Sequence, residues 1–308
     1  MRIHFPFDRE QFVVRHLFAL MLVWSIFPQL PSFGQPAVLQ TNRFHHYVDR
    51  FADDDLEQVL NAVPNNEAWQ WMDENIPFFE CPSSELEQTY YFRWWSFRKH
   101  IKKTPDGMVL TEFLRSVSHA GKYNTVSCAA GHHLAEARWL RDTTIGDEYT
   151  RFWFRSGEHG QSASHFHKFS SWIPSAIYDR YLVTGDQRIC IELLDALVRD
   201  DEAWVVERQL ENGLFWQYDV KDGMEESISG GRHAKNARPT INSYMAANAR
   251  AIAKIAQLAG RSELAESFLA KYHSRLSMLH EHLWDSDATF FEAQNRMSFH
   301  ERIFCSSY

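Results

Sequence analysis

Four carboxylates lie close together between positions 219 and 226 of this sequence: Asp219, Asp222, Glu225 and Glu226. Neighbouring carboxyl groups can perform general acid–base chemistry, because burial or a nearby negative charge raises the pKa of one group and keeps it protonated near neutral pH. Glu225 has Glu226 beside it and Asp222 three residues before it. We therefore predict that Glu225 is a general acid, with Asp222 as second choice. The alternative interpretation is that these acids cap the following turn.

The same stretch, residues 212–244, carries aromatic and polar side chains that could bind a sugar. Aromatic rings stack on the C–H faces of pyranoses, and polar groups hydrogen-bond to their hydroxyls. Large rings are costly to leave in water, so we expect this loop to pack over a concave surface. The predicted binding residues are Trp216, Tyr218, Glu226, Arg238, Asn242 and Tyr244. Weaker candidates are Arg93, Trp94, Trp95, Trp139, Arg141 and Asp142, and for Trp94 and Trp139 core packing is the favoured interpretation.

Length and composition narrow the class of protein. The 308 residues fit one large domain or two small ones, and a hydrophobic fraction of 44% provides for a sizeable core. The formal net charge of −8 argues against a nucleic-acid partner, since proteins that bind phosphate backbones concentrate basic charge. The many aromatic residues fit either a sugar-binding cleft or an aromatic core.

Residues 1–34 are predicted to be a signal peptide. Three arginines precede an apolar run of 11 residues at 17–27, and Ser32-Phe33-Gly34 follows with a cleavage position after Gly34. The run is shorter than the about 20 apolar residues of a membrane-spanning helix. We expect an exported protein, periplasmic or extracellular, with no stable membrane span after cleavage. The alternative is an uncleaved interfacial anchor.

From residue 84 the chain reads as a succession of helices. Ser84–Lys103 is a predicted helix, with Ser84 and Glu87 as its capping box. Gly146, Gly185 and Gly260 are predicted turns between helices, as in αα-hairpins. Because the spacing of these turns is uneven, a regular 34-residue repeat fits poorly. The pattern predicts an all-α toroid of helical hairpins, with residues 35–83 as an N-terminal extension and 84–308 as the helical domain.

Histidines raise the question of a metal site. The relevant residues are His132, His133, His159, His165 and His167. No cluster of Cys or Asp accompanies them at the spacing of metal ligands, so we interpret them as polar loop residues. The sequence predicts neither a metal nor a cofactor.

Two motifs carry a family resemblance. Asp222-Gly223-Met224-Glu225-Glu226-Ser227 is followed by Arg238-Pro239-Thr240-Ile241-Asn242-Ser243-Tyr244. With these motifs and the hairpins, the chain from Tyr90 onward resembles the six-hairpin (α/α)6-barrel glycoside hydrolases of the trehalase, processing α-glucosidase and mannosylglycerate hydrolase-like group. Members carry a small-Gly-hydrophobic-acid element whose acid is the general acid. Here Glu225 stands where the relatives usually have Asp.

The resemblance implies a glycoside hydrolase of the inverting type that cleaves an α-glucoside or α-mannoside. Inverting enzymes hold their two carboxyl groups far enough apart to admit a water. Its partner would be a carbohydrate substrate. The family's catalytic base lies in the C-terminal half of the barrel, and about eight helices are predicted here where six hairpins need twelve. We therefore expect residues 84–308 to be a truncated barrel and a poor hydrolase.

Two alternatives belong to other functional classes. A sugar epimerase or lyase on the same toroid would use His or Tyr as its base, and a concave face lined with His would favour it. A catalytically dead carbohydrate-binding helical-repeat protein would show regular repeats without the acidic loop.

Overall fold

Three αα-hairpins dominate the part of the chain that the structure describes. The computed structural model describes residues 39–223, 232–295 and 302–303. The hairpins are α5 (Ser127–Ala137) with α6 (Thr144–Arg155), α7 (Ile173–Thr184) with α8 (Arg188–Arg208), and α9 (Pro239–Leu258) with α10 (Ser262–Leu283). The described residues from 43 onward belong to one compact unit.

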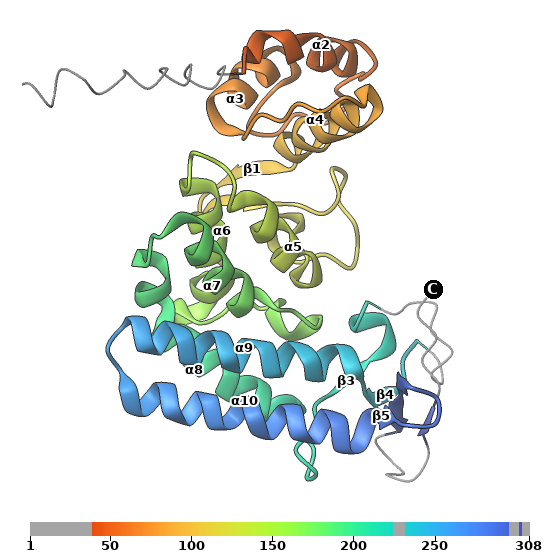
Figure 1. Cartoon of the computed structure of the whole chain (residues 1–308), viewed down its shortest axis with the longest axis vertical. Helices are drawn as coiled ribbons and strands as arrows, with labels where there is room; N and C mark the ends of the chain where they lie inside the picture. Colours follow the sequence, from red (N-terminus) through yellow and green to blue (C-terminus); the bar gives the residue numbers. More distant parts are fainter. Residues whose placement is uncertain (1–38, 224–231, 296–301, 304–308) are drawn as a thin grey trace, which may run out of the picture. The chain divides into compact units, whose positions relative to one another are not determined.

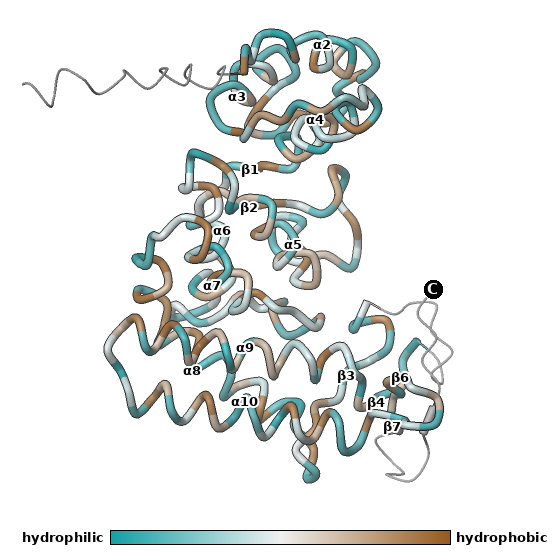
Figure 2. Tube along the Cα trace, in the orientation of Figure 1, coloured by the Kyte–Doolittle hydropathy of each residue, from teal (hydrophilic) through white to brown (hydrophobic). Residues whose placement is uncertain are grey.

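The hairpins are arranged in layers. Within residues 43–308, α5 packs on α7 and α7 packs on α9, whereas α6 packs on α8. The α9 and α10 helices lie antiparallel along most of their length (Figure 1), and polar and apolar positions alternate along both (Figure 2). This is the helical-hairpin arrangement of an (α/α) toroid, and it confirms the predicted all-α fold class.

Glycine turns close two of the hairpins as predicted. Gly185 and Gly260 have φ of +69° and +70°, a left-handed conformation that glycine adopts at little cost. Gly146 was predicted as a third turn, and this is wrong, because it lies inside the first turn of α6. There Thr150 donates a hydrogen bond to the Gly146 carbonyl, 2.7 Å away.

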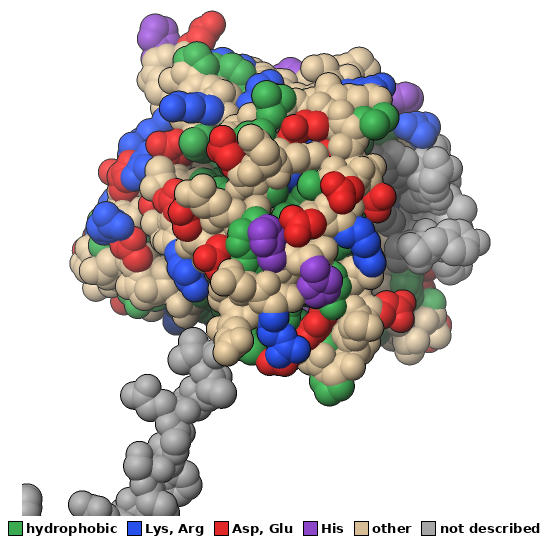
Figure 3. Space-filling view, turned by 90° about the horizontal axis from the view of Figure 1, so that it is seen from above, with side chains coloured by type: hydrophobic (Ala, Val, Ile, Leu, Met, Phe, Trp, Pro, Cys, Tyr) green, Lys and Arg blue, Asp and Glu red, His purple; other side chains and the backbone are tan. Residues whose placement is uncertain are grey.

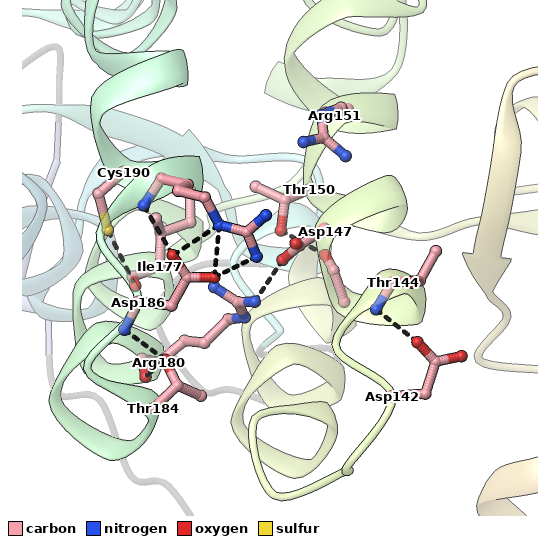
Figure 4. Close-up of polar contacts among 12 residues, drawn as sticks. Asp142, Thr144, Asp147, Thr150, Arg151, Ile177, Arg180, Thr184, Asp186 and Cys190 are labelled. Atoms are coloured by element: carbon pink, nitrogen blue, oxygen red, sulfur yellow. Dashed lines mark hydrogen bonds and ion pairs between the residues drawn. The ribbon is translucent and has the colours of Figure 1, made fainter.

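An ion pair joins neighbouring hairpins. Arg180 of α7 places Nη2 2.6 Å from Oδ1 of Asp147 on α6 (Figure 4). Burial raises the pKa of Asp147, and the Arg180 charge opposes that rise. On the next turn, Asp186 binds the Arg188 guanidinium, and this holds the pKa of Asp186 at about 2.

Because the turns within the hairpins are short, the long connections all lie at the opposite end of the helices. They are residues 100–126, 156–172 and 209–238. Long loops gathered on a rigid scaffold are the usual place for binding and catalytic residues. The topology therefore brings the acidic stretch to the same end as two other long loops.

The helices before residue 100 pack among themselves. They are α2 (His45–Asp53), α3 (Ala68–Asn75) and α4 (Ser84–Lys99), and both α2 and α3 pack on α4. The predicted cap of α4 is wrong by one residue, since Ser83 is the N-cap and its hydroxyl accepts from the Leu86 N–H. Glu87 instead accepts hydrogen bonds from Tyr47 and from the Cys81 N–H.

The predicted helix 84–103 also ends too late. The α4 helix stops at Lys99, and β1 (Ile101–Thr104) pairs with β2 (Gly107–Leu110) in an antiparallel hairpin. Its turn contains Pro105, Asp106 and Gly107, with φ of +101° at Gly107. Pro-Asp-Gly is a turn signature, so this hairpin could have been found in the sequence.

A small antiparallel sheet, which was not predicted, flanks the helices. Its order is β3 (Trp216–Tyr218), β4 (Lys235–Ala237), β7 (Ala293–Asn295) and β8 (Arg302–Ile303), while β5 (Trp284–Asp285) pairs with β6 (Phe290–Phe291). Two buried clusters attach it to the helices. One contains Trp204, Phe215, Ile241 and Met245, and the other Leu214, Ala237, Leu279 and Leu283.

Short 3-10 turns complete the elements: η1 (Thr41–Phe44), η2 (Asn65–Glu67), η3 (Lys122–Asn124), η4 (Glu158–Gly160), η5 (Phe166–Lys168) and η6 (Asp219–Lys221). On the face shown in Figure 3, acidic, basic and histidine side chains are interspersed. Among the described helices, none is long and apolar enough to cross a membrane.

Candidate active site

One arginine binds two buried carboxylates beneath the acidic turn. Arg238 precedes α9, and its Nη1 lies 2.6 Å from Oδ1 of Asp219 while its Nε lies 3.1 Å from Oδ2 of Asp222. All three side chains are at most 1% exposed. Both carboxyl groups are thus withdrawn from bulk solvent, and such burial disfavours the ionised form of a carboxyl group.

Asp222 responds to this environment. Burial raises its pKa to about 6, although the hydrogen bond from Ser170 and the charge of Arg238 both oppose the rise. Ser170 also donates its backbone N–H to the Lys221 carbonyl, at 2.9 Å. Since both carboxylate oxygens are engaged inside the protein, Asp222 fastens the turn in place.

Gly223 ends the described part of the turn. Its φ is +74°, and apart from its chain neighbours no atom of the described residues lies within 4 Å of the position that a Cβ would take. Glu225 and Glu226, the first-choice acid and its neighbour, lie outside the described residues. Both assignments stay predictions.

Trp216 and Tyr218 project from β3 beside the turn. Trp216 is buried, with the Arg208 guanidinium 4.3 Å and the Lys235 ammonium 5.0 Å from the ring centroid. Tyr218 is half-buried and meets the Trp216 ring edge-on at 5.4 Å. Cations over the indole stabilise its position in β3, and the predicted stacking on sugar stays a prediction for both residues.

Asn242 performs a structural task in the first turn of α9. Its Oδ1 accepts from the Phe215 N–H at 2.8 Å, and its Nδ2 donates to the carbonyls of Phe215 and Arg238, both at 2.8 Å. This amide therefore fixes the strand entering the acidic turn to the helix leaving it. Its predicted contact with substrate stays a prediction.

Tyr244 lies one turn further along α9 and is half-buried. Burial raises the pKa of its hydroxyl, and the Asp222 charge adds to that rise. The predicted contact of Tyr244 with substrate stays a prediction.

A cavity of about 530 Å³ lies beside the turn, and we call it the histidine cavity. Its lining includes Arg93, Phe113, Glu136 and Phe169 together with His100, His119, His132 and His133. Phe169 connects it to the acidic turn, because the Lys221 ammonium lies 4.7 Å from the centre of that ring. Of the weaker sequence candidates, Arg93 lines this cavity, whereas Trp94 and Trp95 are buried and Trp139 is exposed.

Several of these residues were missed in the sequence. Ser170 lies 52 residues before its partner Asp222, and no local pattern announces such a contact. Of the cavity histidines, the sequence singled out His132 and His133, but not His100 and His119. Among the described residues, no group of three or more His, Cys, Asp or Glu side chains could hold a metal ion.

Comparison with known proteins places the chain in a family. Residues 122–302, more than half of the chain, match the model of the mannosylglycerate hydrolase MGH1-like glycoside hydrolase domain. A solved structure named as a sialidase superposes with a TM-score of 0.80 and 44% sequence identity, covering 83% of this chain and 24% of that one. This chain thus corresponds to about a quarter of that protein's length. No curated protein matches. The chain belongs to the MGH1-like glycoside hydrolase domain family.

Proposed function

We propose that the protein cleaves an α-glycosidic bond, in an α-glucoside or α-mannoside, with inversion at the anomeric carbon. The observation that carries the proposal is the pair of buried carboxylates, Asp219 and Asp222, bound to Arg238 directly before the predicted acid. This cluster holds the backbone before Glu225 in one position. A catalytic side chain needs such support, because it acts only in a defined geometry.

In this mechanism Glu225 donates a proton to the glycosidic oxygen. A second carboxyl acts as general base on a water, and inverting enzymes hold the two groups about 6.5–9.5 Å apart to admit that water. Asp222 acts as a positioning residue, because its oxygens bind Ser170 and Arg238 inside the protein. The substrate would reach the enzyme outside the cytoplasm, as the predicted signal peptide implies.

The test measures hydrolysis of aryl α-glucosides and α-mannosides by the protein expressed from its full reading frame. Proton NMR of the first product formed identifies its anomer. We expect the β-anomer and a loss of about 10²–10⁴-fold in kcat for Glu225→Gln, the usual range for a general acid. Release of the α-anomer would contradict inversion, and full activity of Glu225→Gln would refute the assigned acid.

The histidine cavity favours a second candidate, an epimerase or lyase that abstracts a carbon-bound proton. Four imidazoles line it, and a neutral imidazole is a suitable base. Such a reaction exchanges substrate hydrogen with solvent, whereas hydrolysis does not. Deuterium entering a C–H position of the sugar in D2O, and its loss in His132→Ala, would favour this alternative.

A further inference from the structure

We propose that the histidine cavity is a binding subsite for an uncharged pyranose unit of the substrate, and that it rejects acidic sugars. The inference rests on the proposed glycosidase function and adds the place and the charge class of the bound sugar. The cavity volume of about 530 Å³ lies in the range of known ligand pockets.

Ring faces are available in the cavity. Phe113 is 40% exposed, and its ring meets the His119 ring edge-on with centroids 5.5 Å apart. His132 is exposed on α5 and meets the Trp172 indole edge-on at 5.2 Å. An exposed aromatic ring in a polar cavity offers an apolar surface of the kind that the C–H face of a pyranose covers.

The charges in the cavity are already matched. Arg93 forms an ion pair with Glu136. His133 lies 3.1 Å from Oε2 of Glu112 and 3.3 Å from the hydroxyl of Tyr149. Among the described residues that line the cavity there are one arginine and two glutamates besides the four histidines, so with neutral imidazoles the lining has no surplus positive charge for a carboxylate or phosphate. Sugar hydroxyls can both donate to and accept from these groups.

The rim beside Phe113 is held in place by one buried amide. Asn124 donates from Nδ2 to the carbonyls of Phe113, at 2.6 Å, and Arg115, at 3.1 Å. Its Oδ1 accepts from the Val117 N–H at 3.0 Å. A rim ordered before binding lowers the entropy that a ligand must offset.

The cavity and the acidic turn share a segment of chain. Phe169 lines the cavity, and the next residue, Ser170, donates to Asp222. The Lys221 ammonium lies over the Phe169 ring. A sugar in the cavity would therefore lie next to the turn that leads to Glu225, where a bond joining it to a second unit could be cleaved.

The experiment is a titration of protein with 13C-labelled histidine rings, followed by NMR. The probes are methyl α-mannopyranoside, methyl α-glucopyranoside and N-acetylneuraminic acid. We expect at least one neutral glycoside to shift the His119 and His132 signals, with His45, which does not line the cavity, unchanged. N-acetylneuraminic acid at the same concentration should shift none of them.

Variants locate the binding. Phe113→Ala should raise Kd about tenfold, equivalent to about 1.4 kcal/mol, because ring surface covered by the ligand is lost. Phe113→Tyr keeps the ring and should retain affinity. Phe79→Ala is the matched control, since Phe79 is 39% exposed and lies outside the cavity.

The following outcomes would contradict the subsite or the glycosidase function. Tighter binding of the acidic sugar, or equal Kd for Phe113→Ala and the unchanged protein, would overturn the inference. Failure of all three probes to shift the His119 and His132 signals would overturn it as well. Binding in the cavity without turnover of any glycoside would refute the glycosidase function alone. Turnover that depends on Glu225, with KM unaffected by Phe113→Ala, would refute the subsite alone.

Discussion

The Nε2 atom of His167 lies 3.0 Å from Oδ1 of Asp200, and this contact fastens the loop 156–172 to α8. On the other side of the ring, Nδ1 lies 2.9 Å from Oε1 of Glu207. The His167 side chain is 14% exposed and that of Asp200 4%, so this histidine of the loop is largely shielded from solvent and connects the loop to α8. Three residues later the same loop supplies Ser170 to the acidic turn.

The first prediction concerns the pH dependence of this connector. Burial alone would lower the pKa of His167, but hydrogen bonds with Asp200 and Glu207 outweigh it and raise the pKa to about 9 from the ordinary 6.5. The folded protein therefore holds this proton more tightly than the unfolded chain. The stabilisation is complete below pH 6.5 and is lost as pH rises through 9.

Thermal unfolding of His167→Asn and the unchanged protein between pH 6 and 10 tests this. We expect a loss on the order of 3 kcal/mol near pH 6, because Asp200 loses its partner, and a difference that shrinks above pH 9. His159→Asn in the same loop, on an exposed histidine, is the control. A difference that does not change with pH would contradict the charged state of His167.

The second prediction concerns Ser170. Its hydroxyl stabilises the ionised form of Asp222, so Ser170→Ala should raise the pKa of Asp222 above its value of about 6. Neighbouring Ser171→Ala is the control. Carboxyl 13C NMR during a pH titration measures the shift, and a fall in the pKa of Asp222 would show that the hydroxyl does not act in this way.

Local signals predicted most of the helical fold. The sequence predicts one helix over 239–259 and another from a cap at Ser262 to about Leu283. The α9 and α10 helices begin and end within one residue of these bounds, because Pro239 and Gly260 are strong markers of a helix start and end. Gly146 is also a glycine, but unlike Gly260 it lies inside a helix, since α6 begins two residues before it. Glycine alone therefore does not distinguish a turn between helices from a position inside a helix.

The site was predictable only in part. The sequence singled out Asp222, Arg238 and the stretch that contains them, because carboxylates and an arginine that lie close together in one loop are able to interact. It did not reveal that the Arg238 guanidinium binds Asp219 and Asp222 inside the protein, because the burial of a side chain depends on the tertiary structure. The histidine cavity draws on α4, α5 and two loops, and no single stretch contains its pattern.

The third prediction concerns the buried arginine. Arg238→Lys should destabilise the protein by about 3–5 kcal/mol, because a single ammonium does not reproduce the two separate contacts to Asp219 and Asp222. Arg261, on the surface, pairs with exposed Asp195, and Arg261→Lys should change stability by less than about 1 kcal/mol. Denaturant unfolding compares the two variants, and equal effects would show that the buried cluster contributes no more than a surface pair.

The fourth prediction concerns two helical glycines. A Cβ on Gly131 would lie 2.5 Å from Cε2 of the Trp172 ring, so Gly131→Ala must displace the indole and should cost about 1–3 kcal/mol of stability. Gly146 has space, with the nearest atom 3.6 Å away, and Gly146→Ala should stabilise α6 by up to about 1 kcal/mol. Because Trp172 meets His132 of the histidine cavity, Gly131→Ala should also shift the His132 ring signal, whereas Gly146→Ala should leave it in place. Unfolding curves and histidine NMR on both variants measure these effects, and a stabilising Gly131→Ala would contradict the close contact with Trp172.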